Sequence, residues 1–144
     1  MRLALQTDYA LRTLMFLAWR GERATIVQVA AFYGISQAHV AKVVNQLARQ
    51  RYVRSIRGLG GGLELARRPE DISVGEVIRA FEGPLHLLEC IGTEDVCAIQ
   101  GFCKLRGVLA EADRLQREHL DGVTLADVLP ARRHIQQYEQ SRSG

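Results

Sequence analysis

The chain has 144 residues, of which 47% are hydrophobic and 24% charged, and its formal net charge is +3. This length supports one hydrophobic core with an appended element, which argues against a large enzyme. No apolar run approaches the roughly 18 residues that a membrane-spanning helix needs, and residues 1–20 lack a signal-peptide pattern, so we expect a cytoplasmic protein without a membrane partner.

The net charge conceals an uneven distribution along the chain. Residues 1–68 hold eleven Lys and Arg against three acids, a net of +8, whereas residues 69–144 hold eight against thirteen, a net of −5. A basic half predicts contact with a polyanion, because lysine and arginine pair with phosphates. The acidic half is then expected to serve a different purpose.

Three helices are predicted in the basic half. The first is expected to have Thr7 as its N-cap and to end at the next glycine. Thr25 and Gln28 form a capping-box pattern for a short second helix that ends at Gly34, and Ser36 can cap a third. The expected apolar faces are Leu11, Leu14, Met15 and Ala18, then Ile26, Val29, Ala30 and Tyr33, then Val40, Val43, Val44 and Leu47.

The spacing of the second and third helices predicts a helix-turn-helix, because only Gly34 and Ile35 separate them. The third helix keeps a polar outer face that suits phosphates and base edges in a DNA major groove. The residues on that face are Gln37, His39, Lys42, Asn45, Gln46 and Arg49. The alternative is a helical core whose third helix is polar only because water surrounds it.

A change of periodicity after the third helix predicts a β-hairpin. Residues 52–56 and 63–66 alternate between apolar and polar side chains, and a glycine-rich turn at residues 57–62 joins them. A hairpin directly after a recognition helix is the wing of a winged helix, whose tip residue Arg57 suits a minor groove. With the basic bias, this pattern favours DNA binding over the solvated core. One recognition helix needs a two-fold partner to read a palindromic operator in double-stranded DNA.

The acidic half is predicted to hold helices on either side of a loop. Ser73 and Glu76 form a second capping box for a short helix that ends near Gly83. From about Cys103 the apolar spacing describes an amphipathic helix of roughly five turns. We interpret it as a dimerisation helix, because the winged helix before it already has a core. A short helix is expected at residues 124–129, and the polar tail after Pro130 is expected to be frayed.

All three cysteines, Cys90, Cys97 and Cys103, lie in this polar loop with the spacing C-x6-C-x5-C. A stable disulfide is disfavoured in a reducing cytoplasm, and a closed zinc site needs four ligands and usually a C-x2-C pair. Their clustering favours metal ligation over three unrelated buried thiols. Iron-sulfur clusters are held by thiolates and accept a different fourth ligand, and zinc remains an alternative. The missing C-x-x-C argues against a thiol oxidoreductase or electron carrier.

Several stretches also carry a family resemblance that covers nearly the whole chain. They are TDYALRTLMFLA, YGISQAHVAKVVNQL, VRSIRGLGGGLELA, SVGEVIRAFEG, the three cysteines and TLADVL. With these stretches the chain resembles the winged-helix iron-sulfur transcriptional repressors, which include the nitric-oxide sensor NsrR, the cluster-biogenesis regulator IscR and the iron regulator RirA. The likeness is greatest to the branch that senses nitric oxide.

The resemblance implies a homodimeric repressor that holds a [4Fe-4S] cluster and releases its operator when nitric oxide nitrosylates or destroys that cluster. In the nitric-oxide-sensing branch, an aspartate in the TDYALR opening of one subunit completes a cluster held by three cysteines of the other. The resemblance therefore nominates Asp8 beside Cys90, Cys97 and Cys103. Arg106 stands where the IscR branch has a ligating histidine, and it cannot ligate. Without the resemblance, Asp8 is simply an acid in the first turn of a helix, where the helix dipole favours it.

We therefore predict a mainly α fold with a small β-hairpin, organised as a winged helix-turn-helix plus a long dimerisation helix. The expected division is a DNA-binding domain at residues 1–82, a cluster-binding loop at 83–102 and a dimerisation segment at 103–144. An iron- or redox-responsive regulator of the same fold is an alternative, as is a zinc-stabilised DNA-binding module. The predicted DNA contacts are Gln37, His39 and Lys42 in the major groove, Ser36 as helix cap and phosphate contact, Arg57 in the minor groove, and Arg2 and Arg54 at phosphates.

Overall fold

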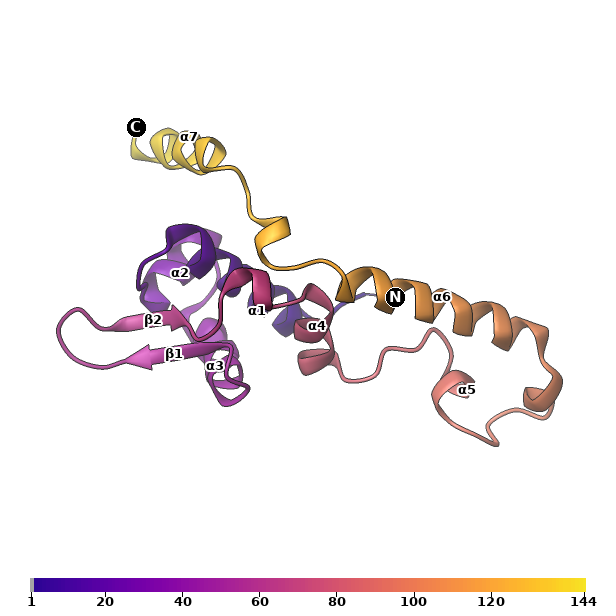
Figure 1. Cartoon of the computed structure of the whole chain (residues 1–144). Coiled ribbons are helices and arrows are strands. Elements are labelled where there is room, and N and C mark those ends of the chain that lie inside the picture. The colour runs from indigo at the N-terminus through magenta and orange to yellow at the C-terminus, as the bar shows by residue number, and fades with distance from the viewer. Residues whose placement is uncertain (1) are drawn as a thin grey trace.

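The computed structural model describes residues 2–144 as a mainly helical chain with one two-stranded antiparallel sheet. Its elements are α1 (Leu5–Arg20), α2 (Ile26–Tyr33), α3 (Gln37–Arg49), β1 (Val53–Ile56), β2 (Gly62–Leu65), η1 (Pro69–Asp71), α4 (Val74–Glu82), α5 (Glu89–Gly92), η2 (Gln100–Phe102), α6 (Lys104–Asp121), η3 (Ala126–Val128) and α7 (Arg132–Ser143). The elements from α1 to α4 form a winged-helix unit, and α6 projects away from it toward α5 and the cysteine segment (Figure 1). The expected fold class is confirmed.

The core of the winged-helix unit lies between its first three helices. Leu14 of α1, Val29 of α2 and Leu47 of α3 are each 0% exposed. All four residues predicted for the inner face of α3 are buried. A fully buried Val or Leu side chain contributes roughly 1.5–3 kcal/mol relative to exposure, so this shared core fixes α3 against α1 and α2.

Side-chain caps determine where α2, α3 and α4 begin, as predicted. Thr25 and Ser73 each form the expected reciprocal capping box. Ser36 Oγ accepts a backbone N–H in the first turn of α3. Gly34 ends α2 with φ of +67°, a left-handed conformation that few other residues adopt. The short turn between α2 and α3 is thereby fixed from both sides.

The start of α1 differs from the prediction that Thr7 caps it. The helix begins at Leu5, its N-cap Ala4 provides no side-chain bond, and Thr7 is buried inside the first turn. The Thr7 hydroxyl donates to the carboxylate of Glu82 at the end of α4, which also accepts the backbone N–H of Ala4 at 2.6 Å. Thr7 therefore ties α1 to α4, a long-range role that its local sequence does not reveal.

The predicted wing is present and is anchored to the helical core. In its register, Arg54 of β1 lies opposite Glu64 of β2. Leu63 exchanges two backbone hydrogen bonds with Ala24, just before α2, at 2.7 and 3.1 Å. The turn needs glycine at Gly61, where an added Cβ would lie only 2.3 Å from a backbone carbonyl oxygen. The hairpin tip is thus held in a fixed direction relative to α2 and α3.

The far end of the chain returns to the winged-helix unit after α6. Leu125 N–H donates to the Ile72 carbonyl, and Val74 N–H to the Val123 carbonyl, both at 2.8 Å. Leu125 is 1% exposed and belongs to the core. The short helix expected at residues 124–129 is the single 3₁₀ turn η3. Among residues 2–144, no helix combines the length and apolar character needed to cross a bilayer.

The tail after Pro130 corrects the expectation of a frayed end, because it forms the helix α7. Tyr138 packs edge-on against Phe32 of α2, with ring centroids 5.4 Å apart. Arg142 donates to the carbonyl oxygen of Phe32 at 3.4 Å. These contacts place α7 beside α2, as Figure 1 shows.

Candidate functional site

The recognition helix α3 presents the three residues predicted for the major groove in its N-terminal half. Gln37, His39 and Lys42 are all exposed, and the His39 ring lies 6.0 Å from that of Tyr9. Within the described part of the chain, no carboxylate lies within ion-pairing distance of Lys42. Its ammonium group is therefore available to an anion outside the chain. Ser36 is also exposed while it caps the helix.

Gln46 does not belong to the exposed face on which the sequence placed it. Its amide donates to the Ala80 carbonyl at 3.3 Å, and Gln50 donates to the same oxygen at 3.2 Å. Both side chains therefore connect α3 to α4.

In the described chain, the wing carries one arginine that is paired with a carboxylate and one that is not. Arg54 is 60% exposed and pairs with Glu64 at 3.2 Å, and Glu64 also pairs with Arg23 at 3.1 Å. Arg57 is exposed at the hairpin tip, and residues 2–144 include no carboxylate that pairs with it. Arg2 is exposed before α1. An unpaired cation can replace a phosphate counterion without first breaking an ion pair, so Arg57 is better suited than Arg54 to that role.

The three cysteines lie on one segment beside the start of α6. Cys90 lies in α5, Cys97 is exposed in the following bend, and Cys103 is the N-cap of α6; all three are free thiols. Cys103 Sγ accepts the backbone N–H of Arg106 at 3.4 Å. Across residues 2–144, no three His, Cys, Asp or Glu side chains gather closely enough to hold a metal ion. The three thiols are therefore close in sequence, but their sulfur atoms do not meet around one position in space.

Gln100 is the residue of this segment that sequence reasoning missed. It is 7% exposed, and its amide donates to the carbonyls of Cys90 at 3.1 Å and Thr93 at 2.7 Å, while its oxygen accepts the Val96 N–H at 3.0 Å. Arg106 donates from Nε to the same Cys90 carbonyl at 2.8 Å. A glutamine in a polar loop gives no local signal of this role, since its partners depend on how the loop closes.

The donor set fits an iron-sulfur cluster in its chemistry. Three unbonded thiols on one loop are the ligands that such clusters use, and they leave one place for a different donor. The hydrogen bonds of Gln100 and Arg106 engage the carbonyl of Cys90 and leave its sulfur unoccupied. Zinc is also compatible with these thiols, because thiolates bind zinc as well as iron, although the loop lacks the C-x2-C pair that zinc sites usually have.

Asp8, the proposed fourth ligand, lies in the winged-helix unit on α1. Arg12 donates to its carboxylate from two nitrogens, Nε at 2.9 Å and Nη2 at 2.8 Å. The Arg12 guanidinium in turn lies over the Tyr33 ring, 5.7 Å from its centroid. Figure 1 shows the cysteine segment at the end of α6 that points away from this unit. The structure therefore does not bring Asp8 together with the cysteines of its own chain.

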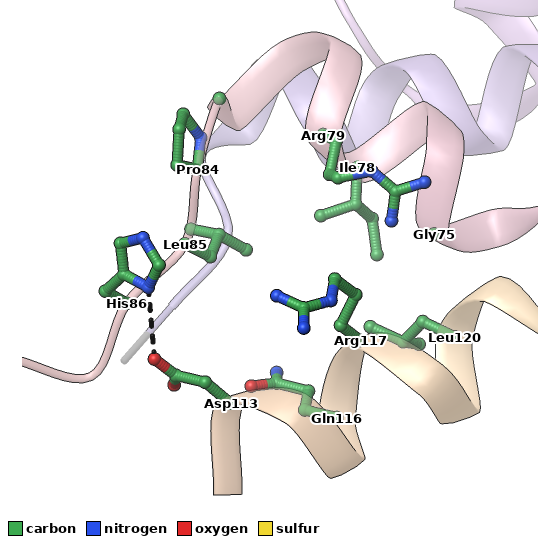
Figure 2. A pocket seen from close by; sticks show the side chains of 11 residues that line it. Gly75, Ile78, Arg79, Pro84, Leu85, His86, Asp113, Gln116, Arg117 and Leu120 are labelled. Carbon is green, nitrogen blue, oxygen red and sulfur yellow. Dashed lines mark hydrogen bonds and ion pairs between the residues drawn. The ribbon is translucent and has the colours of Figure 1, made fainter. Parts of the chain in front are cut away.

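A cavity of about 310 Å³ lies where the linker after α4 runs along α6 (Figure 2). His86 Nδ1 lies 3.2 Å from Asp113 Oδ2, and the Leu87 N–H donates to Oδ1 of the same carboxylate at 3.2 Å. The Asp113 side chain is only 6% exposed. Figure 2 shows Asp113 reaching from α6 to the linker, with Arg117 on the same helix. Asp113 thus fixes the linker that leads into the cysteine segment.

Comparison with known protein sequences identifies regulators over nearly the full chain. Residues 3–131 match the sequence model of the Rrf2 family, which is described as an iron-dependent transcriptional regulator. The HTH-type transcriptional regulator NsrR of Bacillus subtilis (strain 168) is 41% identical over 138 residues, which is 94% of each chain. NsrR of Geobacillus kaustophilus (strain HTA426) is 38% identical over 147 residues and 100% of both chains.

Solved structures of similar regulators share the fold. CymR, the global cysteine regulator of B. subtilis, superimposes with a TM-score of 0.75 at 25% identity, over 89% of this chain and 95% of that one. IscR of T. potens superimposes with a TM-score of 0.71 at 27% identity, over 88% of this chain and 85% of that one.

Proposed function

Because this chain belongs to the Rrf2 family of transcriptional regulators, we propose that it is a homodimeric repressor that senses nitric oxide through a [4Fe-4S] cluster. The observation that carries this proposal is the set of three free thiols on one loop, in a chain similar to regulators named NsrR. The chain is an NsrR-like, DNA-binding transcription regulator with a winged helix rather than an enzyme. To this we add the cluster, the nitric-oxide signal and the dimer as proposals.

Cys90, Cys97 and Cys103 of one subunit and Asp8 of the partner subunit would hold the cluster. When bound, the cluster supplies iron atoms that react with nitric oxide. Asp8 has to exchange the two N–H bonds of Arg12 for this role. A carboxylate oxygen is a harder donor than a thiolate, so the bond from Asp8 is expected to be the most easily exchanged of the four.

A dimer joined through α6 would bring the loop of one chain toward α1 of the other. Leu105, Val108 and Leu115 of α6 are 58%, 66% and 54% exposed, and apolar side chains grouped on one helix usually mark an interface. We therefore keep residues 103–144 as the proposed dimerisation segment, residues 83–102 as the cluster-binding loop and residues 1–82 as the DNA-binding domain.

DNA binding is proposed to use both the recognition helix and the wing. Gln37, His39 and Lys42 would contact the major groove, and Arg57 the minor groove. Ser36, Arg2 and Arg54 would contact phosphates. Two such units must be spaced to match the half-sites of a palindromic operator, because each recognition helix reads its own turn of DNA. Loss of the bond from Asp8 to the loop of the other subunit would allow the two units to change their spacing, and the dimer would then dissociate from the operator.

The proposal is tested with protein purified without oxygen and a DNA duplex selected from random sequence by that protein. Visible absorbance with iron and sulfide counts should report the cluster, and stoichiometric nitric oxide should abolish DNA binding. A Cys97→Ser variant serves as the control that should take up less iron and should not respond. A colourless protein that binds DNA equally well with and without iron contradicts the proposal.

An iron-responsive regulator of the same fold is the second candidate, and the description of the family as iron-dependent favours it. Iron chelation alone separates the two. An iron sensor should release DNA when a chelator removes iron in the absence of nitric oxide. The cluster-loaded protein should then stay on DNA when nitric oxide is added.

A further inference from the structure

The cysteine segment is organised by two polar side chains that meet at one backbone atom. The carbonyl oxygen of Cys90 accepts Gln100 Nε2 at 3.1 Å and Arg106 Nε at 2.8 Å. Gln100 lies within the loop, while Arg106 lies in the first turn of α6. The first cysteine of the set is therefore tied to the middle of the loop and to the helix that follows it.

Both polar atoms of the Gln100 side chain are hydrogen-bonded inside the loop. Beyond Cys90, its amide nitrogen donates to the Thr93 carbonyl at 2.7 Å and to Glu94 Oε2 at 3.3 Å. Its oxygen accepts the Val96 N–H at 3.0 Å. A buried polar side chain with several hydrogen-bond partners favours one arrangement of its surroundings, because other arrangements leave some of those bonds unmade.

Arg106 links the two ends of the segment. Its guanidinium binds the Cys90 carbonyl and pairs with Glu94 Oε1 at 2.8 Å, and its backbone N–H donates to Cys103 Sγ at 3.4 Å. A guanidinium has no acceptor atom and stays protonated, so Arg106 is never itself a metal ligand. Three residues after Cys103, it is instead a permanent positive charge held at the Cys90 carbonyl and paired with Glu94.

We infer that Gln100 and Arg106 are positioning residues that shape the cysteine loop before any cluster binds, and that the Arg106 charge then lies beside the bound cluster. This inference rests on the proposed function for its second half. The first half concerns the cluster-free chain alone. The contacts hold backbone carbonyls, so the sulfur atoms of Cys90 and Cys97 stay free to ligate. A cation next to an anionic cluster favours the reduced form and raises the reduction potential.

The first experiment tests the loop in cluster-free protein under reducing conditions. Hydrogen–deuterium exchange is measured for peptides covering residues 88–103 in wild type, Gln100→Met and Arg106→Met. Each variant should exchange about tenfold faster there, since it removes side-chain partners from backbone carbonyl or N–H groups of the loop and so loosens it. Arg114→Met is the matched control, because Arg114 lies on α6 and pairs only with Glu111 and Glu118 of that helix. Unchanged exchange in both test variants overturns the inference.

The second experiment tests the charge in reconstituted protein. Arg106→Met should lower the cluster's reduction potential. Arg106→Lys should keep it near the wild-type value, because lysine retains the positive charge although it cannot bind the Cys90 carbonyl and Glu94 as the guanidinium does. Gln100→Met should change the visible circular dichroism and lose iron to a chelator several-fold faster. Equal potentials in the Met and Lys variants would overturn the electrostatic role.

Failure of the inference and failure of the proposed function are distinguishable. A wild-type chain that takes up no cluster contradicts the proposed function and the electrostatic role together. Exchange in the cluster-free chain still decides whether Gln100 and Arg106 shape the loop. Thermal unfolding of each variant, which should match wild type, shows that the winged-helix unit is intact.

Discussion

Arg12 binds both carboxylate oxygens of Asp8 from one turn farther along α1, with N–O distances of 2.9 and 2.8 Å. The two side chains are 42% and 40% exposed, and such a pair on a helix surface contributes only about 0.3–0.5 kcal/mol. The pair therefore orients the Asp8 carboxylate but is too weak to prevent it from binding another partner. A metal-ligand bond is strong enough to replace it.

The proposed ligand role of Asp8 predicts a labile cluster when its carboxylate is removed. Asp8→Ala should lose iron to a chelator faster than wild type and change the nitric-oxide response, whereas Arg12→Met should retain the cluster. Visible absorbance followed over time measures both. Asp71→Ala removes an aspartate paired with Arg68 elsewhere and serves as the control. An Asp8→Ala protein with an unchanged spectrum and response would exclude Asp8 as a ligand.

Because Lys42 and Arg57 have no carboxylate partner among residues 2–144, we expect them to contribute most to the salt dependence of DNA binding. Lys42→Met and Arg57→Met should each weaken operator binding and reduce the slope of log affinity against log salt by up to about 0.9, because a cation in either groove also displaces counterions from the phosphates beside it. Arg54→Met should have a smaller effect, because Arg54 already pairs with Glu64. Fluorescence anisotropy at several salt concentrations measures the slopes. Arg114→Met, on α6, should leave the slope unchanged, and an equal loss in all four variants would contradict the assignment.

The partly buried phenol of Tyr33 predicts a loss of stability at alkaline pH. Burial raises the pKa of the Tyr33 hydroxyl well above its ordinary value of 10.0, with a smaller lowering effect from Arg12. Because the folded chain then retains a proton that the unfolded chain releases, the free energy of unfolding should be undiminished below 10.0 and fall as pH rises above it.

Tyr33→Phe removes this titration and also the bond from the Tyr33 hydroxyl to the Arg12 carbonyl. The variant should be about 1 kcal/mol less stable at neutral pH and show a shallower alkaline decrease. Urea unfolding across the alkaline range measures both quantities. Identical alkaline slopes in variant and wild type would show that Tyr33 is not responsible.

The contact between Tyr138 and Phe32 predicts that α7 stabilises the winged-helix unit. Tyr138→Ala should lower the free energy of unfolding by about 1–2 kcal/mol, since it removes an aromatic pair and the area that the pair buries. Tyr138→Phe keeps the ring and loses only the hydroxyl that Arg142 binds, so it should lie closer to wild type. A Tyr138→Ala protein as stable as wild type would mean that α7 does not dock on α2 in solution.

Local patterns predicted much of the fold correctly because their causes are local. The capping boxes at Thr25 and Ser73 join residues three positions apart, and the inner face of α3 follows the helical period. Thr7 was mistaken for a cap because threonine is a preferred N-cap residue and disfavours a helix interior. Its actual partner, Glu82, lies 75 residues away, beyond the reach of any local pattern.

The candidate site was predictable only in its residue types. The cysteine spacing and the basic bias indicated ligation and DNA binding, while the contacts of Gln100 depend on how the loop closes. Helix α7 was missed because its sequence has no continuous apolar stripe, and its docking depends chiefly on one aromatic contact with Phe32. Gln46 was misplaced for a similar reason, since its partner Ala80 lies in another helix.

Helix α6 has 18 residues, which at 1.5 Å per residue separates its two ends by about 27 Å. The thiols lie at one end of α6 and the DNA-binding unit with Asp8 lies at the other. In the proposed dimer, the Asp8 of each subunit would therefore bind the cluster held by the thiols of the other subunit. A mixed dimer of one Asp8→Ala subunit and one Cys97→Ser subunit would then contain one complete ligand set, whereas neither homodimer contains any. Co-expression of the two defective chains should restore part of a response that each lacks alone.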